Sequence, residues 1–239
     1  LALSSNTLEG STPQWIVGMN IADLSLESAF ITSNREALAA LYSSAGGSNW
    51  TNKSNWMNNP GTECTWFGIT CQDGNVTIID LSGNNLTGSI PSKIGGSTNL
   101  TKLDLSSNQL SGSIPAEIGN LSNLTTLLLP NNQLSGSIPA EAGSLDNLTT
   151  LTLSNNKLSG AIPSELGLLL KLETLDISSN SLTGSIPTAL SSLASLKTIN
   201  LSSNNLGGSI PSVLGNLSSL TYLNFSNNLL SSSVPAELG

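Results

Sequence analysis

The chain has no histidine, and charged and aromatic residues make up only 9% and 4% of its 239 residues. Without histidine, neither a Ser-His-Asp nor a Cys-His catalytic arrangement can be built. The two cysteines fall short of the about four Cys or His ligands that a structural zinc site needs. These shortages predict a protein that is not an enzyme and that uses no cofactor and no metal.

Positive charge is also scarce. Only seven residues are Lys or Arg, and the net charge is −8. Nucleic acids and anionic membrane surfaces both favour a basic patch, so neither is expected as a partner. No run of about 18 apolar residues is present, which predicts no membrane insertion within this segment. The first residues, "LALSSNTLEG", lack an initiator Met and a signal-peptide layout, so we expect a mature or excised piece.

What the chain does have is one sequence motif repeated seven times with a period of 24 residues. Leu or Ile, Asn and Pro each recur in a fixed phase, and the LxxLxLxxNxL pattern with a period of 20 to 29 residues is the signature of leucine-rich repeats. The 38% of residues that are apolar fall at regular positions and can form a core. The asparagine column consists of Asn84, Asn108, Asn132, Asn156, Asn180, Asn204 and Asn228.

Each position of the repeat has a physical role. In "LTKLDLSSN", Leu103 and Leu105 alternate with polar residues, which predicts a short strand with one buried face. The Asn column turns the chain, and its amides can satisfy backbone groups of adjacent coils. A glycine column (Gly88, Gly112, Gly136, Gly160, Gly184 and Gly208) permits a tight bend where a side chain would collide. We therefore predict a right-handed α/β leucine-rich-repeat superhelix with a parallel sheet on its concave face and helical turns outside.

Three segments are expected. Residues 1–32 match the repeat weakly and resemble the tail of an upstream array. Residues 33–75 form an N-terminal cap, in which Ser33 and Glu36 make a capping box, a helix follows, and Gly46-Gly47 ends it. Trp50, Trp56 and "CTWFGITC" would plug the first coil. Residues 76–239 hold the seven repeats, with no C-terminal cap.

The two cysteines, Cys64 and Cys71, lie seven positions apart. That spacing can close a small disulfide loop in an oxidising compartment, and the alternative is a pair of free, buried thiols.

The "LxGxIPxxLGxLxxL" phrase, preceded by a helical cap and "C-x-W-x-G-I-T-C", resembles the plant-type extracellular leucine-rich repeats. Receptor-like ectodomains and polygalacturonase-inhibiting proteins belong to that group. The resemblance implies a secreted or cell-surface solenoid that binds protein or glycan partners and catalyses nothing.

The exposed face of the predicted sheet is the candidate ligand face, because partners of curved repeat arrays usually bind there. It offers few aromatic anchors, only Tyr222 beside a small apolar spot at Leu128 and Pro130. Asp80 and Asp104 would lie one strand apart, and we expect solvated carboxylates rather than a catalytic pair. The candidate residues are Thr101, Lys102, Asp104, Thr125, Thr126, Leu128, Pro130, Thr149, Thr150, Thr152, Glu173, Thr174, Asp176, Lys197, Thr198, Asn200, Tyr222 and Asn224.

Two alternatives stay open. Regular Thr and Ser columns on a chain poor in charge could order water and bind ice. Leu168 and Leu170 occupy outer positions where other coils are polar, which suggests packing against copies of the chain in a structural assembly.

N-glycosylation is the expected modification, since eleven N-x-S/T sequons occur. They are Asn49, Asn52, Asn75, Asn85, Asn99, Asn120, Asn123, Asn147, Asn200, Asn216 and Asn224.

Overall fold

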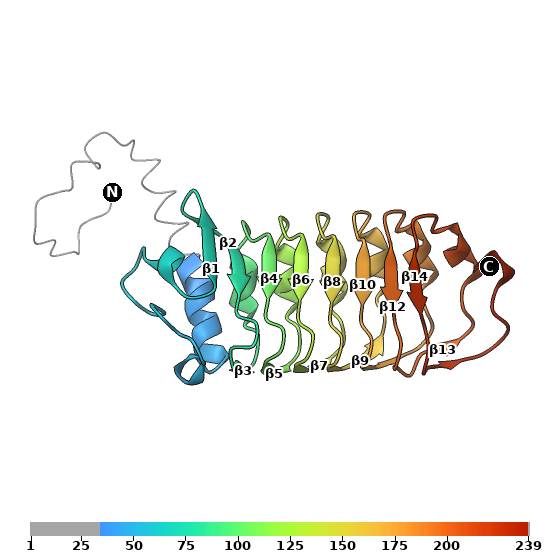
Figure 1. The fold of residues 1–239 in the computed structure, drawn as a ribbon, viewed down its shortest axis with the longest axis horizontal. Helices are drawn as coiled ribbons and strands as arrows, with labels where there is room; N and C mark the ends of the chain where they lie inside the picture. Colours follow the sequence, from blue (N-terminus) through green and yellow to red (C-terminus); the bar gives the residue numbers. More distant parts are fainter. Residues whose placement is uncertain (1–33, 239) are drawn as a thin grey trace, which may run out of the picture.

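The computed structural model describes residues 34–238. The predicted degenerate repeat over 1–32 and the capping residue Ser33 lie outside the described residues. The remainder is a solenoid in which each 24-residue coil contributes one strand to a long sheet, drawn facing the viewer in Figure 1. The predicted leucine-rich-repeat fold is confirmed.

The long sheet has eight strands in the order β1-β2-β4-β6-β8-β10-β12-β14. Only β1 and β2 pair antiparallel, and every later pair is parallel with a 24-residue register. The strands are β1 (Ile69–Gln72), β2 (Asn75–Asp80), β4 (Lys102–Asp104), β6 (Thr126–Leu128), β8 (Thr150–Thr152), β10 (Thr174–Asp176), β12 (Thr198–Asn200) and β14 (Tyr222–Asn224).

A second set of parallel strands follows the asparagine turn of each coil. They are β3 (Thr87–Gly88), β5 (Gln109–Gly112), β7 (Gln133–Gly136), β9 (Lys157–Ala161), β11 (Ser181–Thr183), β13 (Gly207–Gly208) and β15 (Leu229–Leu230). The first five form one sheet and the last two pair separately.

The outer side of each coil is a single 3-10 turn that starts directly after the repeat's proline, whose extended backbone leads into it. These turns are η4 (Ser92–Gly96), η5 (Ala116–Asn120), η6 (Ala140–Ser144), η7 (Ser164–Leu168), η8 (Thr188–Ser192), η9 (Ser212–Asn216) and η10 (Ala236–Leu238). They lie behind the long sheet in Figure 1.

The cap begins with a helix that is described over residues 34–44. Leu38 and Leu41 on its inner face are fully buried. Gly46 then adopts a left-handed conformation (φ 70°), as the predicted helix end requires. Two 3-10 turns, η2 (Gly47–Asn49) and η3 (Glu63–Thr65), connect the helix to β1.

An aromatic cluster fills the space between the cap helix and the first coil. The rings of Trp50 and Trp56 meet edge to face at 4.7 Å between centroids, and Trp66 lies 4.9 Å from Trp56. All three are at least 94% buried and belong to the same apolar core as Ile79 and Leu81. The predicted aromatic plug on the first coil is present.

The asparagine column holds neighbouring coils together, as predicted. Asn132 accepts a hydrogen bond from the backbone N–H of Leu110 (2.9 Å), one coil earlier. Its amide N–H group donates to the carbonyls of Leu105 (2.9 Å) and Leu129 (3.2 Å). The same contacts recur at the other interior asparagines, so backbone groups that would be buried without partners are satisfied along the whole core.

The predicted reason for the glycine column is wrong for most of its members. Gly112 has φ 74°, so the bend is real, but a Cβ there would meet only an ordinary contact at 3.5 Å. The collision occurs in a second column that the sequence reasoning missed. A Cβ at Gly119 would lie 2.4 Å from the carbonyl oxygen of Glu141 in the next coil. Gly119 therefore sets how closely the outer turns stack.

Candidate ligand-binding surface

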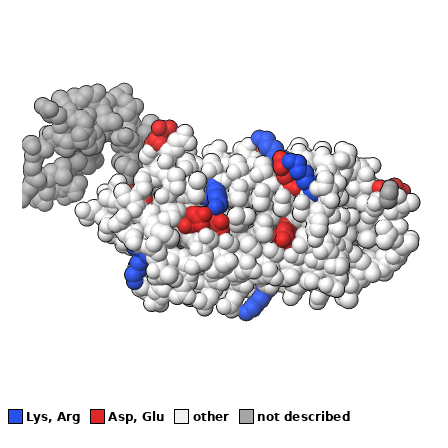
Figure 2. All heavy atoms as spheres, viewed as in Figure 1, with Lys and Arg blue, Asp and Glu red and all other residues white. Residues whose placement is uncertain are grey.

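The strand register places the candidate ligand-face residues in continuous columns. One column joins Lys102 to Thr126, Thr150, Thr174, Thr198 and Tyr222 through adjacent parallel pairs. A second column lies two residues further along each strand and joins Asp80 to Asp104, Leu128, Thr152, Asp176, Asn200 and Asn224. Most of the surface over the long sheet carries no charge in Figure 2. The face is therefore a neutral, polar surface with a few charged points.

In the Asp and Asn column, most side chains also close the turn after their strand. Asp176 accepts hydrogen bonds from both the N–H (3.0 Å) and the hydroxyl (2.6 Å) of Ser178. Asn200 accepts the same pair from Ser202. These Asx turns hold the side chains in one orientation. The column is rigid before any partner arrives.

A third column lies at the start of the strands, where the Thr hydroxyls have a structural role. Thr125 donates its hydroxyl proton to the carbonyl of Thr101 (2.9 Å), and Thr149 donates to that of Thr125 (3.0 Å). Where the threonines stop, Lys197 and Glu173 form an exposed ion pair at 2.6 Å. This hydroxyl ladder adds one hydrogen bond per coil to the backbone ladder.

The charged point nearest the cap is a cluster in which Lys102 bridges two carboxylates. Its Nζ lies 2.9 Å from Asp80 and 3.2 Å from Asp104. Asp104 is only 7% exposed, so the expectation that both carboxylates are solvated is wrong for Asp104. Burial acts to raise the Asp80 pKa, but hydrogen bonds from Lys102 and Ser82 outweigh it and lower the pKa below its ordinary value.

Lys102 shows the reverse shift. The hydrogen bond to Asp80 raises the Lys102 pKa, against the opposing effect of burial, and Asp104 adds to the rise. The single ammonium of Lys102 is thus shared between two carboxylates and balances only one of their two negative charges. A general acid needs a carboxyl that keeps its proton near neutral pH, and the lowered pKa of Asp80 is the opposite condition.

The apolar anchors of the face are few, as the sequence indicates. Tyr222 is 49% exposed, and its hydroxyl accepts a hydrogen bond from the Asn224 amide (3.2 Å). Leu128 and Pro130 are both half-buried. Both belong to the coil of β6, four coils from Tyr222, so they form a contact point separate from it.

A groove of about 420 Å³ runs along the edge of the sheet where the strands begin. Sequence reasoning missed it as a site, although its asparagines share one 24-residue phase. The lining side chains are all polar: Gln72, Asp73, Asn75, Thr77, Asn99, Thr101, Asn123, Thr125 and Asn147. The β1–β2 hairpin, whose turn rises above the neighbouring strands in Figure 1, contributes Gln72 from the end of β1 and Asp73 from the turn.

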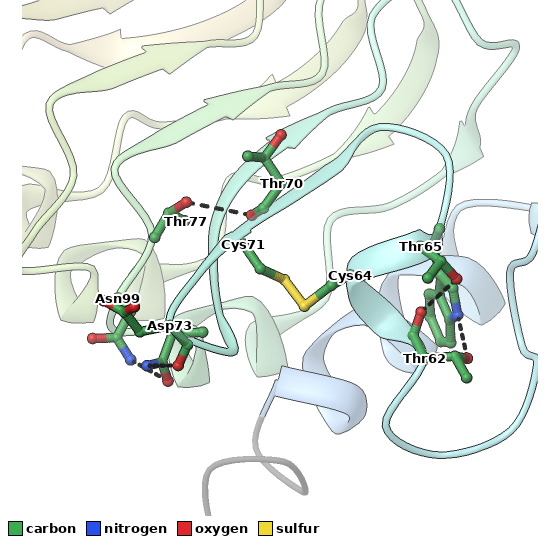
Figure 3. The surroundings of a disulfide bond; sticks show 10 residues. Thr62, Cys64, Thr65, Thr70, Cys71, Asp73, Thr77 and Asn99 are labelled. Carbon is green, nitrogen blue, oxygen red and sulfur yellow. Dashed lines mark hydrogen bonds between the residues drawn. A yellow bond between two sulfur atoms is a disulfide. The ribbon is translucent and has the colours of Figure 1, made fainter.

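The predicted disulfide between Cys64 and Cys71 is present, with 5.5 Å between the Cα atoms. It attaches strand β1 to η3 of the cap. Figure 3 shows the disulfide on one side of the hairpin, with Thr77 and Asn99 on the other side. The bond therefore fixes the hairpin that borders the groove.

The sequons fall into different environments, and which of them carry glycans stays a prediction. Asn120 and Asn216 end outer turns and are exposed, and the described structure gives their side chains no hydrogen bond. Asn75, Asn99, Asn123 and Asn147 line the groove instead.

The role of the outer leucines in an assembly also stays a prediction. Leu168 and Leu170 are 62% and 61% exposed, as expected for the proposed assembly patch.

Residues 34–238 contain no group of three or more metal-binding side chains. None of the helices in that range is long and apolar enough to cross a bilayer.

Stacked parallel strands, an asparagine ladder and an aromatic cap together define a leucine-rich-repeat solenoid. The profile "Leucine rich repeat" matches residues 74–134 and 146–206, just over half of the chain. The profile "Leucine rich repeat N-terminal domain" matches residues 31–72. The chain therefore belongs to the leucine-rich-repeat family. No curated protein sequence matches it.

Similar solved structures come from plant receptors. The chain is 35% identical to the PEPR1 chain solved with AtPEP1 (TM-score 0.80), over 87% of this chain and 30% of that one. It is 34% identical to the ectodomain of the Arabidopsis receptor kinase HAESA, solved with an IDA peptide hormone (TM-score 0.74), over 86% of this chain and 35% of that one. A plant ice-binding protein is 25% identical (TM-score 0.57), over 87% of this chain and 82% of that one. The chain spans about a third of the two receptor chains.

Proposed function

We propose that this chain is a non-catalytic extracellular recognition module that binds a peptide or protein partner on the exposed face of the long sheet. The observation that carries the proposal is the register of that sheet, which aligns the outward side chains of seven strands, β2 to β14, into one continuous surface. The similar PEPR1 structure, solved with AtPEP1, and the HAESA structure, solved with a peptide hormone, support this assignment.

The chemistry of the face indicates the kind of partner. Its side chains are mostly threonine, aspartate and asparagine with a few lysines and one glutamate, and its one exposed aromatic group is Tyr222, so the described face offers no deep apolar pocket for a single anchor. An extended segment that makes many weak polar contacts across several coils fits this face better than a compact domain with one hot spot. Cell-surface or secreted localisation follows from the same proposal, and the disulfide requires an oxidising compartment.

The ice-binding alternative is less well supported by the geometry. The hydroxyl protons of the Thr101 column are already donated to backbone carbonyls. The next column is an unbroken row of threonines from Thr126 to Thr198, but the column beside it mixes Thr152 with Leu128 and Asp176, so regular hydroxyl rows do not extend across the face.

The proposal can be tested by selecting binders from a displayed random peptide library against the chain produced in a secretory host. Thr150 lies at the centre of the face, so Thr150→Arg should weaken the selected peptides at least about ten-fold by steric blocking. Thr188→Arg makes the same change on outer turn η8, where Thr188 is exposed, and should leave binding unchanged. Peptides that lose affinity for Thr188→Arg and keep it for Thr150→Arg would contradict the proposal.

A further inference from the structure

We propose that the groove at the edge of the sheet is a second binding site, which takes a linear, neutral oligosaccharide. This goes beyond the proposed function, because the groove can hold its ligand whether or not a peptide binds to the sheet face. Three features of the groove support this. It is bounded at both ends, its side chains are already held in place, and its lining can accept hydrogen bonds.

The length of the groove is set by one column of the repeat. Asn75, Asn99, Asn123 and Asn147 occupy successive coils in the same phase, and in the next coil that position is Lys171. Lys171 donates from Nζ to the Asn147 side-chain oxygen at 2.7 Å. At the other end the groove meets Asp73 in the hairpin turn. The site therefore spans four coils, about 5 Å apart by strand spacing.

The asparagines are held before any ligand binds. Asn123 donates one amide hydrogen to the carbonyl of Thr98 (2.9 Å), and Asn147 donates one to that of Ser122 (2.8 Å). Asn99 donates to the side-chain oxygen of Asn75 (3.2 Å). Each of these amides keeps a second hydrogen for a ligand. Because the side chains are already ordered, binding loses little rotamer entropy.

The threonines that line the groove present acceptors. Thr77, Thr101 and Thr125 donate their hydroxyl protons to backbone carbonyls of the preceding strand, at 3.3, 2.9 and 2.9 Å. Their lone pairs remain available, and the side-chain oxygens of Asn99 and Asn123 accept no hydrogen bond within the described residues. A matching ligand therefore needs many groups that donate hydrogen bonds to these oxygens and also accept hydrogen bonds from the free amide hydrogens. Sugar hydroxyls do both.

Other ligand classes match the groove less well. Peptide anchors are usually aromatic or aliphatic side chains, and no apolar side chain lines this groove. The two charges at its ends, Asp73 and Lys171, are opposite in sign, so the groove has no net positive charge to hold a chain of uronic acids. A neutral chain of hexoses, with a hydroxyl-rich edge along its length, is the class that the lining favours.

Binding should be measured by titration calorimetry with cellohexaose, laminarihexaose and mannohexaose, and with hexagalacturonate as the charged control of equal length. At least one neutral hexasaccharide should bind, and hexagalacturonate should bind at least ten-fold more weakly. Asn99→Ala and Asn123→Ala should each weaken binding at least ten-fold. Gln133→Ala removes an exposed amide from β7, away from the groove, and should leave the affinity unchanged.

Three outcomes would overturn the proposal. One is that none of the three neutral hexasaccharides binds at about 10 mM. Another is that the two groove variants, shown to be folded by circular dichroism, bind as tightly as the unmodified chain. The last is that glycopeptide mass spectrometry finds a glycan on Asn99 or Asn123, because the protein's own sugar would then fill the groove. Thr150→Arg should leave hexasaccharide binding intact, so failure at the sheet face is distinguished from failure at the groove.

Discussion

The cap and the interior coils are stabilised in different ways. In the cap, each contact occurs once: three tryptophans, one disulfide, and an Arg35–Glu63 ion pair at 2.6 Å with Arg35 also 5.4 Å from the Trp66 ring. In the coils, the same asparagine, leucine and glycine contacts recur at every turn. A repeated contact can be lost at one coil while its copies remain, whereas a cap contact has no copy. The cap is therefore the place where a single change should matter most.

The largest effect is expected for Trp66→Ala. Trp66 is 2% exposed and contacts both Trp56 and Arg35, so its loss should reduce the free energy of unfolding by about 3 to 5 kcal/mol. Urea denaturation followed by circular dichroism measures this. Phe67→Ala removes the adjacent aromatic ring, which is 37% exposed, and should cost much less. Similar losses for the two variants would contradict the assignment of the cap's stability to the buried cluster.

Asn132→Ala tests a repeated contact in the interior. It leaves the Leu110 N–H without its side-chain partner and removes one of two amide donors to the Leu105 carbonyl, and we expect a loss of about 2 kcal/mol. Asn228→Ala removes equivalent bonds in the last repeat, but Asn228 is only half-buried and solvent can replace them. Thermal unfolding measures the loss of stability at each position. Equal losses would show that burial does not determine how much the asparagine hydrogen bonds contribute to stability.

Lys102→Thr tests the ion cluster at the junction of cap and coils, and gives that position the residue found in the next coil. We expect a loss of about 1 kcal/mol at neutral pH, because Lys102 and Asp80 are both partly exposed. The folded pKa of Asp80 is lowered, so its contribution is present above the unfolded value of about 3.9 and is lost as pH falls through the folded pKa.

The difference in unfolding free energy between Lys102→Thr and the unmodified chain should therefore disappear in strongly acidic solution. It should also shrink at very alkaline pH, where Lys102 loses its proton as pH passes its raised folded pKa. Denaturation at pH 7 and at about pH 2 measures the change. A difference that does not vary with pH would mean that Lys102 acts through packing of its alkyl chain.

The smallest effect is expected at Ser97, which stands in the first coil where later coils have leucine. It is fully buried and its hydroxyl has no hydrogen-bond partner. Ser97→Ala removes the unsatisfied group and should stabilise the protein by up to about 1 kcal/mol. A rise in melting temperature would confirm this, and a fall would indicate a water-mediated bond to the hydroxyl. Ser113→Ala, an exposed change of the same kind in the next coil, should have no effect.

Much of the fold could be predicted because a fixed period leaves few choices. Leu103, Asn108 and Pro115 identified strand, turn and outer turn from their spacing alone, and the 24-residue step predicted which side chains share a column. The reasons for individual residues were less accessible. In the sequence, Gly112 and Gly119 are both glycines that recur at steps of 24 residues, yet only Gly119 is in close contact with the next coil. That contact depends on how tightly the outer turns stack.

The candidate site was predictable in outline and not in chemistry. The sequence placed Thr125 and Asp104 on one face, but it could not show that the Thr125 hydroxyl is already donated or that Asp104 is buried beside Lys102. Hydrogen bonds between coils join residues 22 to 27 positions apart, and their geometry follows from the pitch of the solenoid.

By itself, then, the sequence determined the repeat, the side of the sheet that faces the core, the cap and the cysteine pair, because these depend on periodicity and local pattern. Only the tertiary structure decided which polar groups remain free. Stacking the coils uses the hydroxyl protons of the Thr101 column and the first amide hydrogen of Asn123, and it leaves their lone pairs in a groove. What such a polar surface can bind depends on the groups that folding has left without partners.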